Sequence, residues 1–236
     1  MKINKKMKTM NKIINKPLIS IIIPAKNEEK YIKKTLQSIK EQSYKNIEII
    51  VICDNCRDKT QQIAKKYTAK VYDVKMSNVS IARNFGVKQA EGEILVFIDA
   101  DCTMDHILVE KIVQCCKQGY IGGTTKTLPI EDKLNNKLKH KLLWGLGNIS
   151  RHIFLTASGI IFCKAKYFAI FRHDLNIAED TYFILALKKK GKLKYITSSF
   201  IKTSMRRFEK EGYIKTITKQ VFAFLSQKKI KYKEIR

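Results

Sequence analysis

The chain has 236 residues, of which 44% are hydrophobic and 29% are charged, a composition typical of a folded globular protein rather than a disordered one. Its formal net charge of +26 favours binding to polyanions such as nucleic acid, anionic lipid or phosphate-bearing substrates. No apolar run has the length of a membrane span, and the lysine-rich N-terminus lacks the apolar segment of a secretory signal, so we expect a cytoplasmic protein.

The first half of the chain alternates short apolar runs with amphipathic helices. Residues 1–16 carry six lysines and no acid, which indicates a basic tail. Apolar residues at helical spacing predict a first helix that contains Ile32, Leu36 and Ile39. The other expected elements are strands over 18–23, 47–52 and 69–74 and helices over 60–67 and 77–90. This alternation is typical of an α/β fold with a mostly parallel sheet, in which the strand ends share one edge.

The apolar run Ile94–Ile98 is the centre of this pattern, because five such residues suit a strand that is buried on both faces. Asp99 and Asp101 follow it, with one residue between them, so their side chains can point the same way. Two hard oxygen ligands suit Mg²⁺ or Mn²⁺, which would in turn hold a diphosphate. The alternative is a pair of solvated loop acids, one of which caps a helix that starts near Thr103.

The position of other polar residues favours the metal site. In an open α/β sheet, ligands bind beyond the carboxyl ends of the strands, where the loops after each strand meet. The polar residues expected at this edge, together with Asp99 and Asp101, are Lys26, Glu28, Asp54 and Asp58.

The second half of the chain mixes strands with basic helices. Glu179 and Asp180 open an apolar helix over 182–190, where they complement the helix dipole or take part in chemistry. The expected helix over 131–156 contains Trp144, and lysines lie on both sides of its apolar stripe. Three interpretations are open: the helix packs on the sheet, it caps an acceptor site, or it lies on a membrane surface. The other expected elements are a helix over 107–117, strands over 120–127, 157–163, 193–197 and 200–203, and an amphipathic helix over 209–226.

Six cysteines follow no regular spacing, which indicates reduced thiols. Cys53 and Cys56 nevertheless form a C-x-x-C after a predicted strand, the context of a thioredoxin-like redox site. The residues therefore leave two alternatives open: a thiol oxidoreductase that uses this pair, and a basic protein that binds nucleic acid. The second lacks a recognisable binding motif, and its lysines are scattered along the chain.

Five segments, in chain order, resemble the inverting glycosyltransferases of family 2, which share the Rossmann-like GT-A fold. The segments are IIIPAKNE at 21–28, DNCRDKT at 54–60, ARN at 82–84, FIDAD at 97–101 and ED at 179–180. The resemblance covers the chain from about Leu18 to Gly191. It departs at 53–56, where an acidic pair followed by Gly-Ser is usual and this chain has Cys-Asp-Asn-Cys. Because of this departure, the resemblance does not predict which base the nucleotide carries. It also implies that the C-x-x-C spacing is a coincidence.

The resemblance implies a metal-dependent enzyme that moves a sugar from a nucleotide-diphospho-sugar donor to a hydroxyl of a glycan or lipid-linked acceptor. Asp99 and Asp101 would hold Mg²⁺ or Mn²⁺ on the diphosphate. Asp180 would be the general base, and Glu179 would orient that base or the acceptor.

The resemblance also implies a binding site for the donor. Pro24 and Glu28 would line the base and ribose pocket, Asp54 would accept a hydrogen bond from the base, and Arg83 would lie near the base or phosphates. Arg206 and Arg207 would clamp the diphosphate with their guanidinium groups. The full implied set is Pro24, Ala25, Lys26, Glu28, Asp54, Asp58, Arg83, Asp99, Ala100, Arg206 and Arg207.

The expected domain organisation is a basic tail over 1–16, a GT-A domain over 17–204 and a C-terminal amphipathic helix with a basic tail over 205–236. Within the GT-A domain, 17–127 would bind the nucleotide and 128–204 the acceptor. Basic clusters beside the amphipathic helices 138–155 and 209–226 suit peripheral contact with anionic lipid at the inner face of the membrane. A nucleic-acid partner is not expected.

Overall fold

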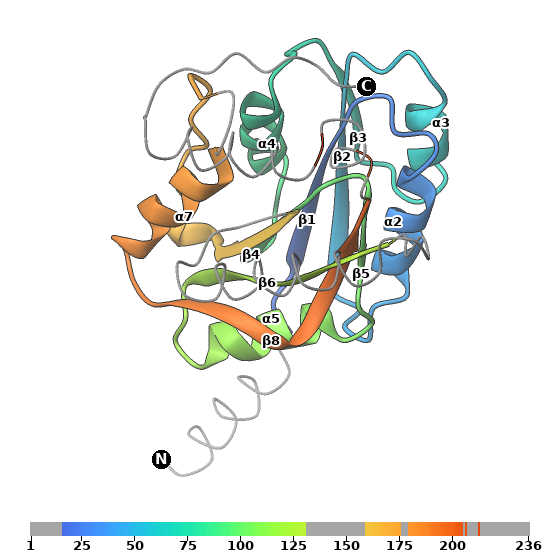
Figure 1. Ribbon diagram of the computed structural model, residues 1–236. Coiled ribbons are helices and arrows are strands. Elements are labelled where there is room, and N and C mark those ends of the chain that lie inside the picture. The colour runs from blue at the N-terminus through green and yellow to red at the C-terminus, as the bar shows by residue number, and fades with distance from the viewer. Residues whose placement is uncertain (1–15, 131–158, 176–178, 205, 207–211, 213–236) are drawn as a thin grey trace, which may run out of the picture.

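The computed structural model describes residues 16–130, 159–175, 179–204, 206 and 212, which form an eight-stranded sheet with helices on both faces (Figure 1). The expected helices over 131–156 and 209–226 lie outside the described residues, as do Arg207 and all but the last residue of the basic tail. Among the described helices, none is both long and apolar enough to cross a membrane.

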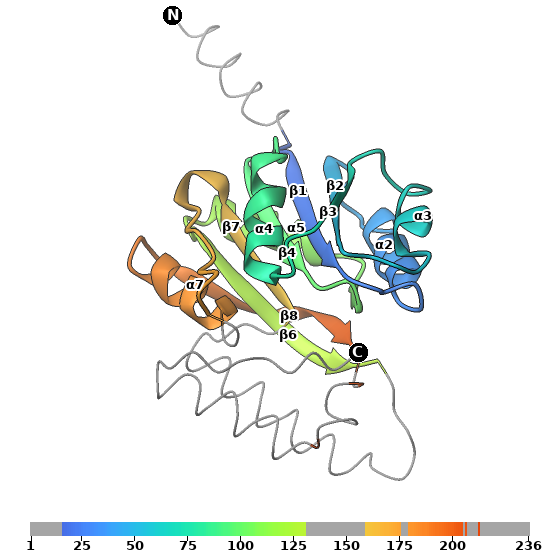
Figure 2. The same ribbon diagram turned by 90° about the horizontal axis from the view of Figure 1, so that it is seen from above.

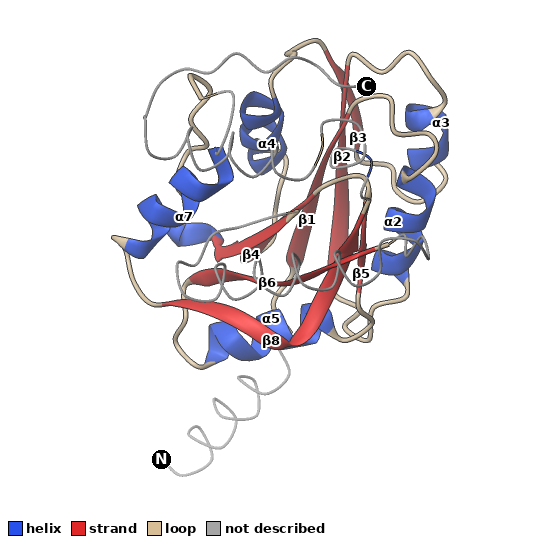
Figure 3. Cartoon of the chain, viewed as in Figure 1, coloured by secondary structure: helices blue, strands red, loops and turns tan. Residues whose placement is uncertain are grey.

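Strands and helices alternate as far as β4, which confirms the expected βαβ rhythm (Figure 3). The strands are β1 Ile19–Ala25, β2 Ile47–Asp54, β3 Val71–Val74, β4 Ile94–Ile98, β5 Cys102–Met104, β6 Gly122–Pro129, β7 Ile160–Lys164 and β8 Leu193–Thr203. The helices are α2 Ile32–Lys40, α3 Thr60–Ala64, α4 Val79–Lys88, α5 Leu108–Lys117 and α7 Glu179–Lys188, with a 3-10 turn η2 at Ala165–Tyr167.

The parallel half of the sheet has the strand order β3-β2-β1-β4. In β1, Ile21 lies beside Ile49 of β2 on one side and Val96 of β4 on the other. Alternate side chains enter different cores, so Ile21 packs with α2 and α5 whereas Ile22 packs with α4 and α7. Figure 2 shows the strands between α4 and α7 on one side and α2 and α3 on the other. Burial on both faces explains why β1, β2 and β4 read as continuous apolar runs.

The other half of the sheet is mixed, because β7 pairs antiparallel with β4 and with β6, whereas β6 and β8 are parallel. The two strands expected over 193–197 and 200–203 are one strand, β8, with a shift of register. Ile196 pairs with Thr125 and Phe200 with the next residue of β6, so three residues bulge between them. The Thr125 hydroxyl donates to the carbonyl oxygens of Ile196 and Ser199, which holds the bulge in place.

The chain after β4 also differs from the sequence prediction. The three residues of β5 pair antiparallel with β8 at the edge of the sheet, so no helix starts at Thr103. A helix does follow, and α5 matches the expected range within one residue. Three residues are too few to show a periodic pattern, so β5 depends on its pairing with a strand almost a hundred residues away.

Candidate active site

The carboxyl ends of β1 and β4 form a topological switch point, because the chain adds β2 and β3 on one side of β1 and then returns to add β4 on the other. Connections diverge there and leave a crevice in which α/β proteins bind ligands. Glu28 follows β1, and Asp99 and Asp101 follow β4. The fold therefore brings the acids of the first and fourth strands to the same edge, as the sequence predicted.

The loops after β1 and β2 are joined by hydrogen bonds between side chains and main chain. Thr60 Oγ1 accepts from the Glu28 amide at 2.7 Å, and Asp58 Oδ2 accepts from the Glu29 amide at 3.0 Å. Asn27 adopts a left-handed backbone conformation with φ of 56°, which asparagine tolerates better than most residues. Asp58, expected at the donor site, thus has a clear structural role in fixing the two loops.

Asp54 is buried at the end of β2 and holds the loop that leads into α4. Its Oδ1 accepts from the amides of Met76 and Ser77 at 2.7 and 2.9 Å, and its Oδ2 accepts from the Asn78 amide at 3.1 Å. Ser77 has φ of 51°, so these bonds stabilise a strained turn. A carboxylate oxygen has two lone pairs, so Oδ2 can accept one further hydrogen bond from a ligand.

The small residues of the implied donor site belong to the frame of the crevice. Ala25 ends β1 opposite Cys53 and is 3% exposed, as is Ala100, whose carbonyl oxygen accepts from Thr35 Oγ1 at 2.6 Å. Pro24 lies within β1, and Lys26 is the first residue after it. Pro24, Ala25 and Ala100 offer main-chain groups and shape rather than reactive side chains.

Arg83 bridges the end of β4 and the first turn of α7. From the middle of α4, its Nη2 donates to Asp99 Oδ1 at 2.9 Å and its Nη1 donates to Glu179 Oε1 at 2.9 Å. The guanidinium is buried, and its carbon lies 5.2 Å from the centre of the Phe171 ring. The two acids that it contacts are 80 residues apart in sequence, so this bridge fixes the head of α7 against the end of β4.

Asn84, the residue after Arg83, fastens α4 to the chain before α7. Its side-chain amide donates to the Phe171 carbonyl at 2.8 Å and accepts from the Phe171 amide at 3.0 Å. The Phe171 ring stacks on Phe183 of α7 at 4.0 Å and contacts Phe97 of β4 edge to face at 4.9 Å. Arg83 and Asn84 of the motif therefore both connect α4 to the region of α7, Arg83 through a charged contact with Glu179 and Asn84 through neutral contacts with Phe171.

Arg206 makes a second bridge, between the ends of β1 and β4. It donates to both carboxylate oxygens of Glu28, at 2.8 and 2.5 Å, and its Nη2 lies 3.3 Å from Asp101 Oδ2. The guanidinium carbon is 4.9 Å from the centre of the Tyr31 ring. Tyr31 carries no recognisable signal in the sequence, because only the fold places it beside a residue that lies after β8.

Asp99 and Asp101 lie close enough to share a cation. Oxygens of the two carboxylates and the Cys102 sulfur fall within 4.8 Å of one another. Two carboxylates fit Mg²⁺ or Mn²⁺. Burial and the adjacent acids raise the pKa of the Cys102 thiol well above its usual range, so this sulfur stays protonated and acts as a weak donor to Asp101. The donor set that fits a hard cation is therefore the two carboxylates.

The electrostatics of Asp101 favour a bound cation. Burial raises the pKa of Asp101 to about 7, with a further contribution from the Asp99 charge and an opposing one from Arg206. Glu28, on the opposite loop, also adds negative charge. An ionised carboxylate in this position is disfavoured, and a positive ion would relieve that cost.

Asp180 lies in the first turn of α7, beside Glu179. Burial, and next the Glu179 charge, raise the pKa of Asp180 to about 7, while Arg83 lowers it. Because a general base works best when its pKa is near the operating pH, Asp180 suits proton abstraction. Helix-dipole complementation alone would not require a pKa so far from the usual value for aspartate.

Both cysteines of the C-x-x-C are reduced in the structure. Cys53 is fully buried, and its hydrogen bond with Cys56, together with burial, raises the pKa of its thiol far above the usual value. Cys56 donates to the Ala25 carbonyl oxygen at 3.4 Å. A buried, protonated thiol is a poor nucleophile, so Cys53 does not suit redox chemistry, whereas contact with Cys53 lowers the pKa of the Cys56 thiol.

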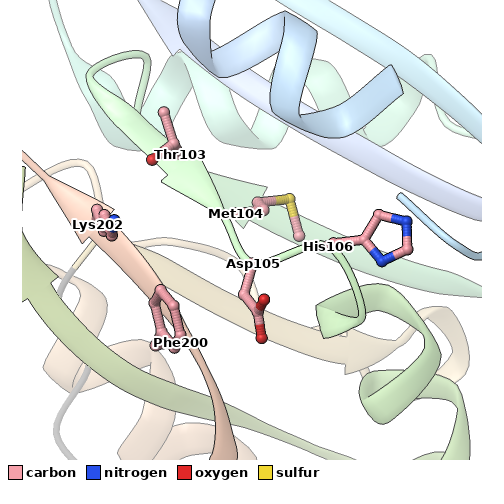
Figure 4. Close-up of a pocket in the computed structure, with 6 residues that line it drawn as sticks. All are labelled: Thr103, Met104, Asp105, His106, Phe200 and Lys202. Atoms are coloured by element: carbon pink, nitrogen blue, oxygen red, sulfur yellow. The ribbon is translucent and has the colours of Figure 1, made fainter. Parts of the chain in front are cut away.

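A shallow hollow lies at the outer edge of the sheet, between β5, β8 and the chain before α5 (Figure 4). It is lined by Thr103, Met104, Asp105, His106, Phe200 and Lys202. In Figure 4 the His106 ring points away from Phe200 and Lys202, and Asp105 Oδ2 accepts from the Ser199 hydroxyl at 2.7 Å. None of the predicted site residues lines this hollow, so the convergence of acids at the switch point identifies the candidate site better than surface shape.

Comparison with known proteins agrees with this geometry. The family model described as glycosyl transferase family 2 matches residues 20–178. The 4,4'-diaponeurosporenoate glycosyltransferase of Staphylococcus haemolyticus is 39% identical over 113 residues, which cover 44% of this chain and 30% of that protein. The chain spans about half or less of the length of the curated relatives that it matches.

Solved structures show the same fold at low identity. TarS 1-349 of S. aureus, in complex with UDP-GlcNAc, has a TM-score of 0.62 at 19% identity, covering 79% of this chain and 58% of that one. Mannosyltransferase PcManGT of Pyrobaculum calidifontis, in complex with GDP-Man and Mn²⁺, has a TM-score of 0.67 at 16% identity, covering 91% and 66%. These likenesses confirm the expected fold.

Proposed function

Because the chain belongs to glycosyltransferase family 2, we propose that it transfers a sugar from a nucleotide-diphospho-sugar to an acceptor hydroxyl, with inversion at the anomeric carbon. The observation that carries the proposal is the convergence of Glu28, Asp99 and Asp101 at the switch point, where Arg83 joins Asp99 to Glu179, the residue before Asp180. This arrangement offers an anionic site for a cation and, next to it, a carboxylate that can accept a proton.

The nucleotide would lie over the loops after β1 and β2. Asp54 has one lone pair to offer the base, and Lys26 and Glu28 lie at the rim of the crevice beyond β1. The left-handed residues Asn27 and Asn55 shape these loops. UDP-GlcNAc and GDP-Man occur in the two solved relatives, so nucleotides with uracil and guanine are the first candidates for the donor.

The diphosphate would lie beside Asp99 and Asp101, which would hold Mg²⁺ or Mn²⁺. A cation there stabilises the negative charge of the nucleoside diphosphate as it leaves. Asp99 is oriented by Arg83, which contacts Oδ1, and its side chain is 41% exposed, so the second oxygen can face the crevice. The guanidinium of Arg206 is close enough to contact a phosphate oxygen after a small movement.

Asp180 would act as the general base. The acceptor oxygen forms a bond to the anomeric carbon while the bond from that carbon to the diphosphate oxygen breaks, and the hydroxyl proton passes to Asp180. One displacement of this kind inverts the anomeric centre. Glu179, held by Arg83, would keep Asp180 in position.

The acceptor is proposed as a hydroxyl of a glycan or lipid-linked molecule. The exposed lysines 188–190 lie at the far end of α7 from Glu179, and the amphipathic helices expected over 138–155 and 209–226 lie outside the described residues. Peripheral contact with anionic membrane therefore stays a proposal, which co-sedimentation with anionic vesicles at low and high salt tests. Equal recovery in the supernatant with and without vesicles would refute it.

Asp180→Asn tests the proposed chemistry, because asparagine keeps the size but cannot take the proton. We expect the rate of donor turnover to fall by about 10²–10⁴-fold, with nucleotide affinity nearly unchanged. Asp174→Asn, at a partly exposed acid paired with Arg172 on the preceding loop, is the matched control and should keep the parent rate. An unaltered rate for Asp180→Asn would remove the base from the mechanism.

A further inference from the structure

Arg206 occupies a central place in the acidic site. Its fork binds both oxygens of Glu28, and the same guanidinium lies 3.3 Å from Asp101, one of the two proposed cation ligands. Its planar group also lies over the Tyr31 ring. Contact with two acids from two different strand ends indicates a specific position rather than a solvated surface arginine.

The charges of the site explain why an arginine is bound there. Five acids converge on two of the described arginines, so the acids outnumber these arginines by three. The acids are Glu28, Asp99, Asp101, Glu179 and Asp180. Arg83 is committed to two of them and its side chain is 8% exposed, whereas the Arg206 side chain is 38% exposed. Of these two arginines, Arg206 is therefore the one that can move more readily.

We propose that Arg206 takes the place of the divalent cation at Asp101 in the donor-free protein, and that its transfer to the diphosphate couples cation binding to nucleotide binding. The inference rests on the proposed function. It explains how the same site would bind the divalent cation and the nucleotide together rather than singly. It assigns to Arg206 a role before the donor arrives as well as after.

Repulsion gives the physical reason for the first half of the cycle. A cation held by Asp101 would share this carboxylate with the guanidinium, whose Nη2 lies 3.3 Å from Oδ2. Two positive centres within about 5 Å repel each other in a partly buried site. The cation alone must therefore displace Arg206 from Asp101 and should bind weakly.

The diphosphate provides the second half of the cycle. Phosphate oxygens accept the guanidinium fork as well as a carboxylate does, so Arg206 can leave Asp101 and keep a charge-assisted partner. Contacts with Glu28 and Tyr31 keep it at the crevice, so the movement is short. By linkage, a nucleotide that removes Arg206 from Asp101 tightens cation binding, and the cation tightens nucleotide binding by the same factor.

Direct measurement of Mn²⁺ binding tests the inference without any assay of activity. Free Mn²⁺ is followed by electron paramagnetic resonance in titrations of the parent and Arg206→Gln, with no nucleotide, with UDP and with GDP. We expect Arg206→Gln to bind Mn²⁺ about tenfold more tightly than the parent without nucleotide, and to lose most of the increase in affinity that the nucleotide gives the parent. Arg206→Lys, which keeps the charge but loses the fork, should lie between them.

Arg172→Gln is the control, because Arg172 pairs with Asp174 away from the cluster of acids. This variant should bind Mn²⁺ as tightly as the parent does. Thermal unfolding confirms that each variant is folded. Equal or weaker Mn²⁺ binding by Arg206→Gln without nucleotide, while the parent binds Mn²⁺ in a nucleotide-dependent way, would overturn the inference and leave the proposed function intact. Absence of Mn²⁺ binding by the parent under every condition would refute both.

Discussion

Arg83→Gln separates two roles for this arginine. Similarity to the family places Arg83 near the base or phosphates, whereas the structure shows it bonded to Asp99 and Glu179. If it positions the acids, the substitution displaces Asp180 relative to the donor, and a displacement of about 1 Å costs on the order of 10²-fold in kcat. The dissociation constants of UDP and Mn²⁺ should change much less.

The stability change can be estimated from the same contacts. Removing one partner of a buried ion pair typically costs about 3–5 kcal/mol. Asp99 is 41% exposed and water can solvate it, so the lower end, about 3 kcal/mol, is the better expectation. The variant should therefore fold with a lower melting temperature, and circular dichroism during heating measures the loss.

A purely structural arginine would lower stability without moving the pH profile, so the profile distinguishes the two. Asp180 is faced by Glu179, Asp99 and Arg83, and of these groups only Arg83 lowers its pKa. Loss of that charge should raise the pKa of Asp180 and move the rise of kcat to higher pH. Arg172→Gln is the control and should keep the parent profile. Weaker UDP binding by more than about tenfold with unchanged kcat would refute the reasoning and place Arg83 at the nucleotide.

Three further predictions follow from the site. Asp101→Ala should abolish transfer yet melt no lower than the parent near pH 8, because the parent's cation-free fold loses stability as pH rises from the usual aspartate pKa of 3.8 to the raised pKa of about 7 and carries the full penalty above it; turnover retained with Mn²⁺ would contradict the metal assignment. The rate at saturating donor should rise through about pH 7, as Asp180 loses its proton, and Asp180→Asn should lack this rise; a parent rate independent of pH would exclude this base. The double variant Cys53→Ser, Cys56→Ser should keep transferase activity, and loss of activity in a protein that remains folded would revive the redox alternative.

Local patterns were sufficient for the parallel half of the sheet. Strands β1, β2 and β4 are buried on both faces, so their apolar runs identify them without knowledge of their neighbours. The βαβ rhythm then places their carboxyl ends together, which brought Glu28 to Asp99 and Asp101 in the prediction.

The rest of the site depends on tertiary contacts that leave no local signal. Arg83 reaches Glu179 across 96 residues, and Arg206 reaches Glu28 across 178. The motif identified both arginines but not their partners, since side-chain direction is decided by packing. The β8 bulge and β5 were missed for the same reason, because each exists through pairing with a distant strand.

The central claim is that the acids at the switch point hold a nucleoside diphosphate through a divalent cation. Thermal unfolding of the parent chain with UDP or GDP, each with and without Mn²⁺, tests it most directly, because a ligand that binds only the folded state stabilises it by about 2.7 kcal/mol at a hundred times its Kd. The account predicts that at least one nucleotide raises the melting temperature only when Mn²⁺ is present, and that Asp101→Ala removes the shift. No shift with either nucleotide and Mn²⁺, or an equal shift in Asp101→Ala, would contradict it.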